Sequence, residues 1–374
     1  MRIRKKDRSC KRKATGRQEY GERGMEMAKV GVMTFLHNDN YGSTLQAYAL
    51  QRVIREMGHE CIHLDYRPDN REKVLNLVMS RNHPKLILDG LKKRSVKADQ
   101  SGARQKSAAF PAFYERRMRL SAPCRNRQEL KKAAADREIL VCGSDQIWNP
   151  VWLNPAYFLT FAGDEIRKVA YAASLGVKEM PDATKIRMIR KWTEGFHGIS
   201  VREEEGAVLL KQITGIEADV MPDPVCLLNP EEWEDIAGEG PEGEKYLLCY
   251  FIGENPKYWE TVRNLQRETG MRVLVMPVTA ESYGQGFETL DGIGPEDFLG
   301  AIRKAERLCT DSFHGLAFAS VFGTETTLLR RYREDDPESK NSRIDHFQRI
   351  LKERGPGKLR EEGRAWLEAQ LGEP

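Results

Sequence analysis

The sequence has no long hydrophobic run. Among its 374 residues, no stretch approaches the roughly 20 apolar residues that a membrane helix requires. Cysteine is scarce too: the seven cysteines are odd in number, widely spaced and never arranged as C-x-x-C. This pattern argues against a disulfide framework and a cysteine zinc site, and favours buried free thiols in a reducing compartment. We therefore expect a soluble, cytoplasmic chain that contacts membranes peripherally at most.

The signatures of several common enzyme classes are also missing. The chain has no G-x-x-x-x-G-K-[ST], H-E-x-x-H or G-x-S-x-G, and no complete G-x-G-x-x-G follows an expected strand. Phosphate-loop hydrolysis, zinc peptidase, lipase and dinucleotide chemistry therefore lack their sequence marks.

Positive charge is concentrated at the N-terminus. Residues 1–24 contain ten Lys or Arg and three Asp or Glu, a net charge of +7. Because the whole chain has a net charge of +4, residues 25–374 carry −3. A mildly acidic body argues against a nucleic-acid partner. The N-terminal segment also lacks the apolar core of a secretory signal.

We interpret residues 1–26 as a basic, disordered tail that arises from a mis-called translation start. Met25 and Met27 stand directly before the first expected strand, and Gly21 to Gly24 can be encoded by a purine-rich run that resembles a bacterial ribosome-binding site. A solvated basic arm is the alternative interpretation.

The length of the chain favours two domains, because a single core becomes unfavourable beyond about 250–300 residues. Prolines between Pro222 and Pro230, followed by a Gly/Glu/Pro-rich stretch, indicate a hinge. We predict an α/β protein with two Rossmann-like, doubly wound domains facing across a cleft, as in the GT-B architecture. The predicted segments are an N-terminal domain at 27–225 with a helical insertion near 68–130, a C-terminal domain at 230–335, and helices in 336–374 that pack across both domains.

Short apolar runs alternate with segments of helical periodicity, which is typical of parallel sheets. Strands are expected at 29–35, 61–64, 139–142, 169–172, 199–201, 218–221, 246–252, 273–276, 308–310 and 326–329. Helices are expected at 44–57, 85–91, 110–120, 183–192, 203–213, 256–269, 296–305, 315–321, 344–352 and 360–371.

Ligands of open α/β sheets bind beyond the carboxyl ends of strands, where two early junctions are unusually polar. The first, His37 to Ser43, precedes a helix whose free N–H groups could hold an anion; taken alone, an ordinary helix cap explains it better. The second, Gly143 to Pro150, combines a carboxylate, amides and an indole. That composition suits sugar recognition and equally suits a buried structural Trp.

Two later junctions carry candidate cations. Arg202 ends an expected strand and offers a planar fork for carboxylate or phosphate, although it could simply pair with Glu203 to Glu205. His314 combines a strand end, a helix start, an adjacent glycine and nearby hydroxyls. A lone histidine is more often structural, but this position suits proton transfer beside an anionic substrate.

At these junctions the sequence resembles the polysaccharide pyruvyl transferase family. The resemblance spans most of residues 29–353 and rests on the ordered set NDNYGSTLQAYAL, GSDQIWNP, ISVREEEG, MPDPV, TDSFHG and NSRI. It implies a GT-B-like fold, phosphoenolpyruvate as donor substrate, and no cofactor or metal. Members tend to carry a basic residue where this chain has Ser312, so Arg330 or Arg331 is expected to supply that charge.

The resemblance also implies the site residues. The catalytic set is His314, Asp145 and Arg202, with Arg202 binding the donor. The expected substrate-binding residues are Asn40, Tyr41, Gly42, Gln46, Ser144, Gln146, Trp148, Ser312 and Arg343.

The implied reaction transfers a pyruvyl group from phosphoenolpyruvate onto a hydroxyl pair of a free or lipid-linked saccharide and forms a pyruvate ketal in cell-surface polysaccharide biosynthesis. Two alternatives stay open at this point. One is a nucleotide-sugar glycosyltransferase of the GT-B type, because fold alone does not fix function. The other is a carbohydrate-binding relative that has lost catalysis, which only Ser312 supports.

Overall fold

The computed structural model describes residues 27–80, 100–177, 179, 182–331 and 341–372. The basic tail at 1–26 and the helical segment expected at 85–91 lie outside these ranges. Within the described residues, no helix is long and apolar enough to cross a membrane. The six described cysteines are buried free thiols, as the sequence predicts.

The first sheet has six parallel strands in the order β2-β1-β3-β4-β5-β6. Its central strands are mostly apolar and buried because helices cover both faces of a parallel sheet, although β4 begins with the half-buried Arg167 and Lys168. All four residues of β3, for example, are buried. The strands are β1 (Lys29–Met33), β2 (Glu60–His63), β3 (Ile139–Cys142), β4 (Arg167–Ala173), β5 (Phe196–Val201) and β6 (Asp219–Val220).

The second sheet has five parallel strands in the order β11-β10-β7-β8-β9. Sequence periodicity predicts four of them; the missed edge strand β9 has only two residues and no apolar run. The strands are β7 (Tyr246–Tyr250), β8 (Arg272–Val275), β9 (Glu288–Thr289), β10 (Arg307–Thr310) and β11 (Glu325–Leu328). The two sheets share no strand, and the expected α/β class with two Rossmann-like sheets is confirmed.

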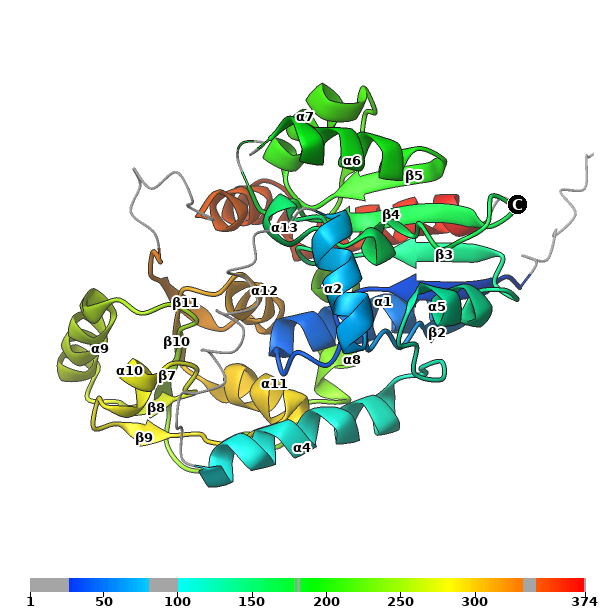
Figure 1. The fold of residues 1–374 in the computed structure, drawn as a ribbon. Helices are drawn as coiled ribbons and strands as arrows, with labels where there is room; N and C mark the ends of the chain where they lie inside the picture. Colours follow the sequence, from blue (N-terminus) through cyan, green and yellow to red (C-terminus); the bar gives the residue numbers. More distant parts are fainter. Residues whose placement is uncertain (1–26, 81–99, 178, 180–181, 332–340, 373–374) are drawn as a thin grey trace, which may run out of the picture.

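Helices connect the strands and cover the sheets (Figure 1). Those of the first half are α1 (Tyr41–Glu56), α2 (Asn70–Met79), α4 (Gln100–Arg117), α5 (Arg127–Ala133), η1 (Pro150–Trp152), η2 (Pro155–Phe158), α6 (Ala183–Thr193) and α7 (Glu204–Thr214). Those of the second half are η3 (Pro224–Leu227), α8 (Pro230–Glu234), α9 (Pro256–Thr269), α10 (Ala280–Tyr283), α11 (Pro295–Lys304), α12 (Phe313–Phe322) and α13 (Asn341–Leu371).

Helix α13 packs across both halves of the molecule, as expected. Its path bends at Gly355, whose backbone is not helical, directly before Pro356. On one side of the bend Phe347 packs against Phe313 of α12, and on the other Trp366 packs against Tyr171 of β4. The two helices expected in this region, at 344–352 and 360–371, therefore lie on the two sides of this kink and share the label α13.

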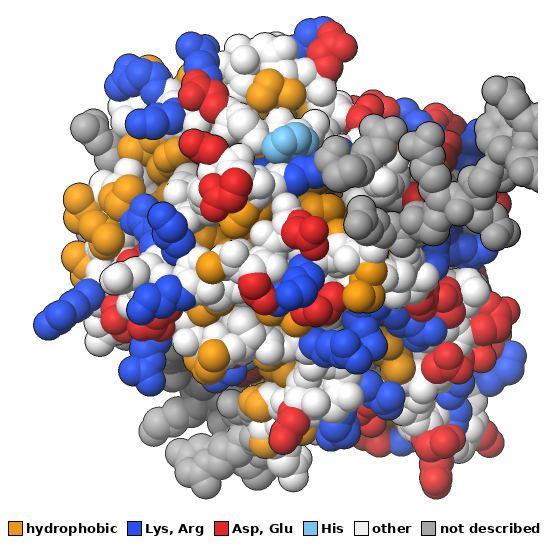
Figure 2. Space-filling model, turned by 90° about the vertical axis from the view of Figure 1, so that its right-hand side faces the viewer, with side chains coloured by type: hydrophobic (Ala, Val, Ile, Leu, Met, Phe, Trp, Pro, Cys, Tyr) orange, Lys and Arg blue, Asp and Glu red, His pale blue; other side chains and the backbone are white. Residues whose placement is uncertain are grey.

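The two halves share a hydrophobic core. Tyr41, the first residue of α1, stacks on Phe298 of α11 with ring centroids 4.4 Å apart and donates a hydrogen bond to the carbonyl of Ile293. Helix α4 also lies beside α11, along the base of the molecule in Figure 1. On the face shown in Figure 2, acidic and basic side chains are interspersed, so neither sign forms a continuous field.

The strand orders fix where a ligand can bind. In the first sheet the order in which successive strands are added reverses between β1 and β3, and in the second sheet it reverses between β7 and β10. At such a switch point the two following loops separate and leave a crevice beyond the carboxyl ends of the strands. The residues after these four strands are therefore the ones that the topology places around a site.

Candidate active site

A cavity of about 150 Å³ lies where the switch points of the two sheets meet. Its lining combines loops after β1 and β3 with loops after β7, β10 and β11 and the start of α13. The lining residues are Asn40, Asp145, Gln146, Ile252, Asp311, Ser312, Phe313, His314, Arg331, Arg343 and Ile344.

The first sheet contributes Asn40 and Asp145. Asn40 caps α1, because its side-chain oxygen accepts a hydrogen bond from the Ser43 amide at 3.1 Å. Asp145 accepts hydrogen bonds from the Ser43 hydroxyl at 2.6 Å and from the Gln146 amide at 2.8 Å. The loops after β1 and β3 are thus bound to each other through Ser43.

The loop after β3 has an unusual backbone. Asp145 has a φ of 66° and Gly143 a φ of 127°. A Cβ atom at position 143 would lie 2.0 Å from the carbonyl oxygen of Tyr171, so only glycine fits there. This close approach to β4 turns the chain so that Asp145 faces the cavity.

The second sheet contributes Asp311 and Arg331. Asp311 accepts hydrogen bonds from the amides of Ile252 and Gly253 at 2.7 and 2.8 Å and from Arg331 Nε at 2.8 Å. Ser312 caps α12 by accepting from the Gly315 amide. Asp311 therefore joins the loops after β7, β10 and β11, and it holds the Arg331 guanidinium at the cavity.

His314 lies in the first turn of α12 and is tightly enclosed. A Cβ atom at Gly42 would lie 2.1 Å from His314 Nδ1, so the imidazole packs directly against the backbone of α1. His314 Nε2 lies 3.6 Å from Asp223 Oδ2. Nε2 is buried and has no hydrogen-bond partner among the described residues.

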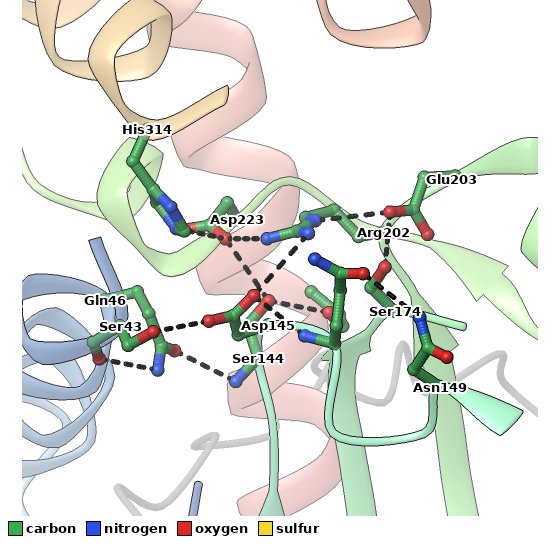
Figure 3. Close-up of polar contacts among 12 residues, drawn as sticks. Ser43, Gln46, Ser144, Asp145, Asn149, Ser174, Arg202, Glu203, Asp223 and His314 are labelled. Atoms are coloured by element: carbon green, nitrogen blue, oxygen red, sulfur yellow. Dashed lines mark hydrogen bonds and ion pairs between the residues drawn. The ribbon is translucent and has the colours of Figure 1, made fainter. Parts of the chain in front are cut away.

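Asp223 and Arg202 form a buried ion pair beside this histidine (Figure 3). Arg202 Nη1 donates to Asp223 Oδ2 at 2.7 Å, and both side chains are almost fully buried. Burial alone would raise the pKa of Asp223, but His314 and Arg202 hold that pKa well below its usual value. For Asp145 too, burial acts to raise the pKa, and the same two cations lower it overall.

Arg343 also has a buried nitrogen without a hydrogen-bond partner among the described residues, as do His314 and Arg202. It comes from the start of α13, and its Nε is buried without a hydrogen-bond partner in the described part of the chain. Burial, reinforced by repulsion from Arg202, lowers the pKa of Arg343 to about 10. The Arg343 side chain is therefore still charged at neutral pH, and its Nε–H group can donate a hydrogen bond to a ligand.

The arrangement suits a small anion. The carboxylates in the lining are occupied by internal hydrogen bonds, whereas Arg202 Nη2, His314 Nε2 and Arg343 Nε have no hydrogen-bond acceptor among the described atoms. The N-termini of α1 and α12 adjoin the cavity through Asn40 and His314. Free amide groups and the helix dipole favour negative charge at such ends.

The cavity brings together half of the residues that the sequence predicts. Those in the lining are Asn40, Asp145, Gln146, Ser312, His314 and Arg343; those behind it are Tyr41, Gly42, Gln46, Ser144, Trp148 and Arg202. Gly42 and Arg202 contact lining residues, and Arg202 pairs with Asp223 as well as the expected Glu203. Direct donor binding by Arg202 stays a prediction.

Three of the predicted substrate-binding residues lie behind the cavity, where they make internal contacts. Trp148 is fully buried, stacks on Phe158 with centroids 4.9 Å apart and donates to the Tyr157 carbonyl, so it belongs to the core. Gln46 and Ser144 are also fully buried, and the Ser144 amide donates to Gln46 Oε1 at 3.0 Å. These two side chains join α1 to the loop after β3.

Sequence reasoning missed Asp223 as a site residue, although the segment MPDPV was part of the resemblance. The available signal was a carboxylate held between two prolines directly after a strand. Arg331 was one of two candidates for the missing cation; the structure places it in the lining, whereas Arg330 pairs with Asp345. In the described ranges no three His, Cys, Asp or Glu side chains gather as metal ligands would.

Two parallel sheets with an arginine- and histidine-lined cavity at their switch points define the class of protein: an α/β protein with two Rossmann-like sheets and a cavity between them. A family model described as polysaccharide pyruvyl transferase matches residues 40–331. The chain belongs to this family, as the sequence motifs predict.

Solved structures resemble the chain only distantly. The UDP-GlcNAc 2-epimerase from Neisseria meningitidis bound to UDP-GlcNAc is 10% identical with a TM-score of 0.49, over 92% of this chain and 99% of that one. The glycosyltransferase SnogD from Streptomyces nogalater is 12% identical with a TM-score of 0.42, over 93% and 100%. At these scores neither supports a statement about activity. No curated protein matches the sequence.

The contact between Gly42 and His314 predicts the effect of a methyl group. Gly42→Ala should lower the melting temperature, because the added Cβ must displace the imidazole, and overpacking of this kind costs about 1–3 kcal/mol. Helix propensity alone would predict the opposite sign. Gly357→Ala, where no atom lies within 4 Å, is the control and should not destabilise. Equal melting temperatures for both variants would contradict the packing of His314.

The buried Asp223 predicts an acid-dependent stability. Its pKa is lower in the folded protein, so its stabilisation is full above the ordinary carboxyl pKa of about 3.9 and is lost as the pH falls through the folded value. Asp223→Asn should cost up to about 3–5 kcal/mol at pH 7, because it removes the nearest counter-charge of the buried Arg202 and leaves only Glu203 at 3.4 Å and Asp145 at 4.0 Å. The variant should also lose less stability than the parent between pH 6 and 3.

Urea unfolding at several pH values measures both effects. Asp235→Asn, at an exposed carboxylate after α8, is the control and should follow the parent at every pH. An Asp223→Asn curve parallel to that of the parent would show that Asp223 contributes nothing to the acid dependence.

Proposed function

We propose that this protein transfers a pyruvyl group from phosphoenolpyruvate onto a hydroxyl pair of a saccharide and so forms a pyruvate ketal. The observation that carries the proposal is the set of buried side-chain nitrogens without a hydrogen-bond partner in the described ranges around a small cavity, contributed by Arg202, His314 and Arg343. Phosphoenolpyruvate carries a carboxylate and a phosphate close together, which match these donors in charge. Family membership supports the same reaction.

The size of the cavity favours a small donor over a nucleotide sugar. Pockets for drug-sized ligands have volumes of roughly 300–1,000 Å³, whereas this cavity has about 150 Å³. Phe313 of the lining is only 6% exposed, with Arg202 over its ring at 4.3 Å, and the predicted candidate Trp148 is buried in the core, so neither offers an open aromatic platform for a base. The glycosyltransferase alternative therefore has no support from this site.

The reaction follows from the chemistry of an enol phosphate. The methylene carbon of the donor gains a proton, a sugar hydroxyl attacks the adjacent carbon, and a second hydroxyl displaces phosphate to close the ring. Two C–O bonds form and one C–O bond to phosphate breaks. The two hydroxyl groups lose two protons in all. One of them compensates for the proton that the methylene carbon gains, and the other leaves with inorganic phosphate.

The residues divide between binding and proton transfer. Arg331 and Arg343 hold the phosphate and carboxylate, aided by the N-termini of α1 and α12. His314 gives the proton, and ionised Asp223, 3.6 Å from Nε2, provides its counter-charge. A positioned acid contributes on the order of a hundred- to ten-thousand-fold. In this proposal, as in the sequence-based expectation, the reaction uses no metal or cofactor.

The acceptor and its location follow from the same proposal. The acceptor is a saccharide of the cell envelope or of an exopolysaccharide, lipid-linked while it is modified at the cytoplasmic side of the membrane. Nucleic acid has no role, in keeping with the interspersed charges of the surface in Figure 2.

The arginines of the lining predict which variants bind phosphoenolpyruvate more weakly. Phosphoenolpyruvate should raise the melting temperature of the parent, and UDP-GlcNAc should not. Arg331→Ala and Arg343→Ala should each weaken phosphoenolpyruvate binding about 10- to 100-fold, because a hydrogen bond to a charged group contributes about 1.5–3 kcal/mol. Arg330→Ala, next in sequence but paired with Asp345, is the matched control. Stabilisation by UDP-GlcNAc alone would refute the proposed donor.

His314 predicts a separation of binding from turnover. His314→Gln should retain phosphoenolpyruvate binding within a few-fold and reduce phosphate release in the presence of acceptor by about two to four orders of magnitude. His197→Gln, at an exposed histidine of β5, is the control. A folded His314→Gln protein with full turnover would remove the histidine from the mechanism.

A further inference from the structure

Helix α2 has its hydrophobic side chains on the outside. Of the nine large hydrophobic side chains that are exposed in the described chain, four belong to this one helix. They are Val74, Leu75, Val78 and Met79, with exposed fractions of 55%, 47%, 66% and 37%. Single exposed hydrophobic residues are ordinary, but a contiguous set on one helix face marks an interaction surface.

The inner side of α2 is polar, which fixes the orientation of the helix. Glu72 and Asn76 are buried, and Asn76 Nδ2 donates to the Tyr66 hydroxyl at 2.8 Å. Glu72 accepts from the same hydroxyl and from Arg127 Nε, each at 3.3 Å. Turning the apolar side inward would break these hydrogen bonds to Tyr66 and Arg127. The fold therefore holds the apolar face toward the outside.

Cations surround this face. Arg71 and Lys73 are exposed on α2 itself, and Arg127 of the adjacent α5 contacts Met79. Lys131 and Lys132 are exposed at the end of α5. The acidic side chains of these two helices, Glu72 and Glu129, are buried or half-buried and engaged in hydrogen bonds. The surface is thus apolar at its centre and mainly positive beside it, through Arg71, Lys73 and Arg127, with Asp69 as an exposed acidic residue at the N-terminus of α2.

This charge pattern indicates which kind of partner can bind the exposed face of α2. The segment that follows α2, residues 81–99, contains six Lys or Arg and two Asp, so its charge has the same sign as the face. A second copy of the chain would bring two positive margins together, and four side chains are few for a dimer interface, which usually involves about 20–30 residues a side. An apolar face with a Lys/Arg margin fits an anionic lipid bilayer.

We infer that the exposed face of α2 binds the surface of an anionic membrane. The helix follows β2, whose carboxyl end lies at the same sheet edge as the loops that carry Asn40 and Asp145. Membrane contact at α2 therefore holds this edge of the sheet toward the bilayer. The consequence for catalysis, delivery of a lipid-linked acceptor to the cleft, rests on the proposed function; the membrane contact itself does not.

Vesicle flotation with the full chain tests the contact without any assay of activity. The parent should bind vesicles of phosphatidylglycerol and phosphatidylcholine at least about tenfold better than vesicles of phosphatidylcholine alone, and salt should weaken the binding. Val74→Asp/Val78→Asp should lose at least about tenfold in binding to the anionic vesicles. Val208→Asp, at an equally exposed valine of α7, is the matched control and should bind like the parent.

Several outcomes would overturn the inference. One is a parent that does not bind anionic vesicles; another is a control variant that loses as much binding as the double variant. A double variant whose melting temperature falls by several degrees would show that the chain itself covers the face. A parent dimer that the double variant splits, as seen by light scattering, would assign the face to a second copy. None of these outcomes bears on donor binding, so the proposed function stands or falls separately.

Discussion

The buried ion pair between Asp223 and Arg202 is the interaction on which the site depends. Asp223 lies directly before η3, in the connection between the two sheets, and Arg202 follows β5 of the first sheet. His314 reaches the same carboxylate from α12 of the second half. Removing either charge would deprive the other of its nearest buried counter-charge, at 2.7 Å, and leave only more distant ones, such as Glu203 at 3.4 Å from Arg202. Breaking a buried pair in this way is costly. The pair therefore fixes the position of both halves around the cavity.

Topology explains why these residues meet. All strands in both sheets are parallel, so every loop with a candidate residue leaves its sheet at the same edge. The loops after β1 and β3 are bound together by Ser43 and Asp145, and the loops after β7, β10 and β11 by Asp311. Hydrogen bonds thus connect the loops within each half, and the cavity lies between these two sets of loops.

The sequence predicts the strands well because buried parallel strands are short apolar runs with polar loops at their ends. It predicts the polar junctions for the same reason. It could not separate lining residues from those behind them: Asn40 and Gln46 belong to one motif, yet one faces the cavity and the other joins α1 to the loop after β3. That difference arises from the turn of a helix and from contacts with distant loops, which no local pattern contains.

Unsatisfied buried donors have a consequence for stability. A buried polar group without a partner costs about 1–3 kcal/mol, and more when it is charged. Arg202, His314 and Arg343 each retain such a donor beside the same cavity, so the fold carries a local cost that its ordinary packing does not relieve. An anion that accepts hydrogen bonds from these groups would remove this penalty, and its removal would add to the free energy of binding. A site of this kind is preorganised, because its cations are held in place by Asp223 and by neighbouring helices before any ligand arrives.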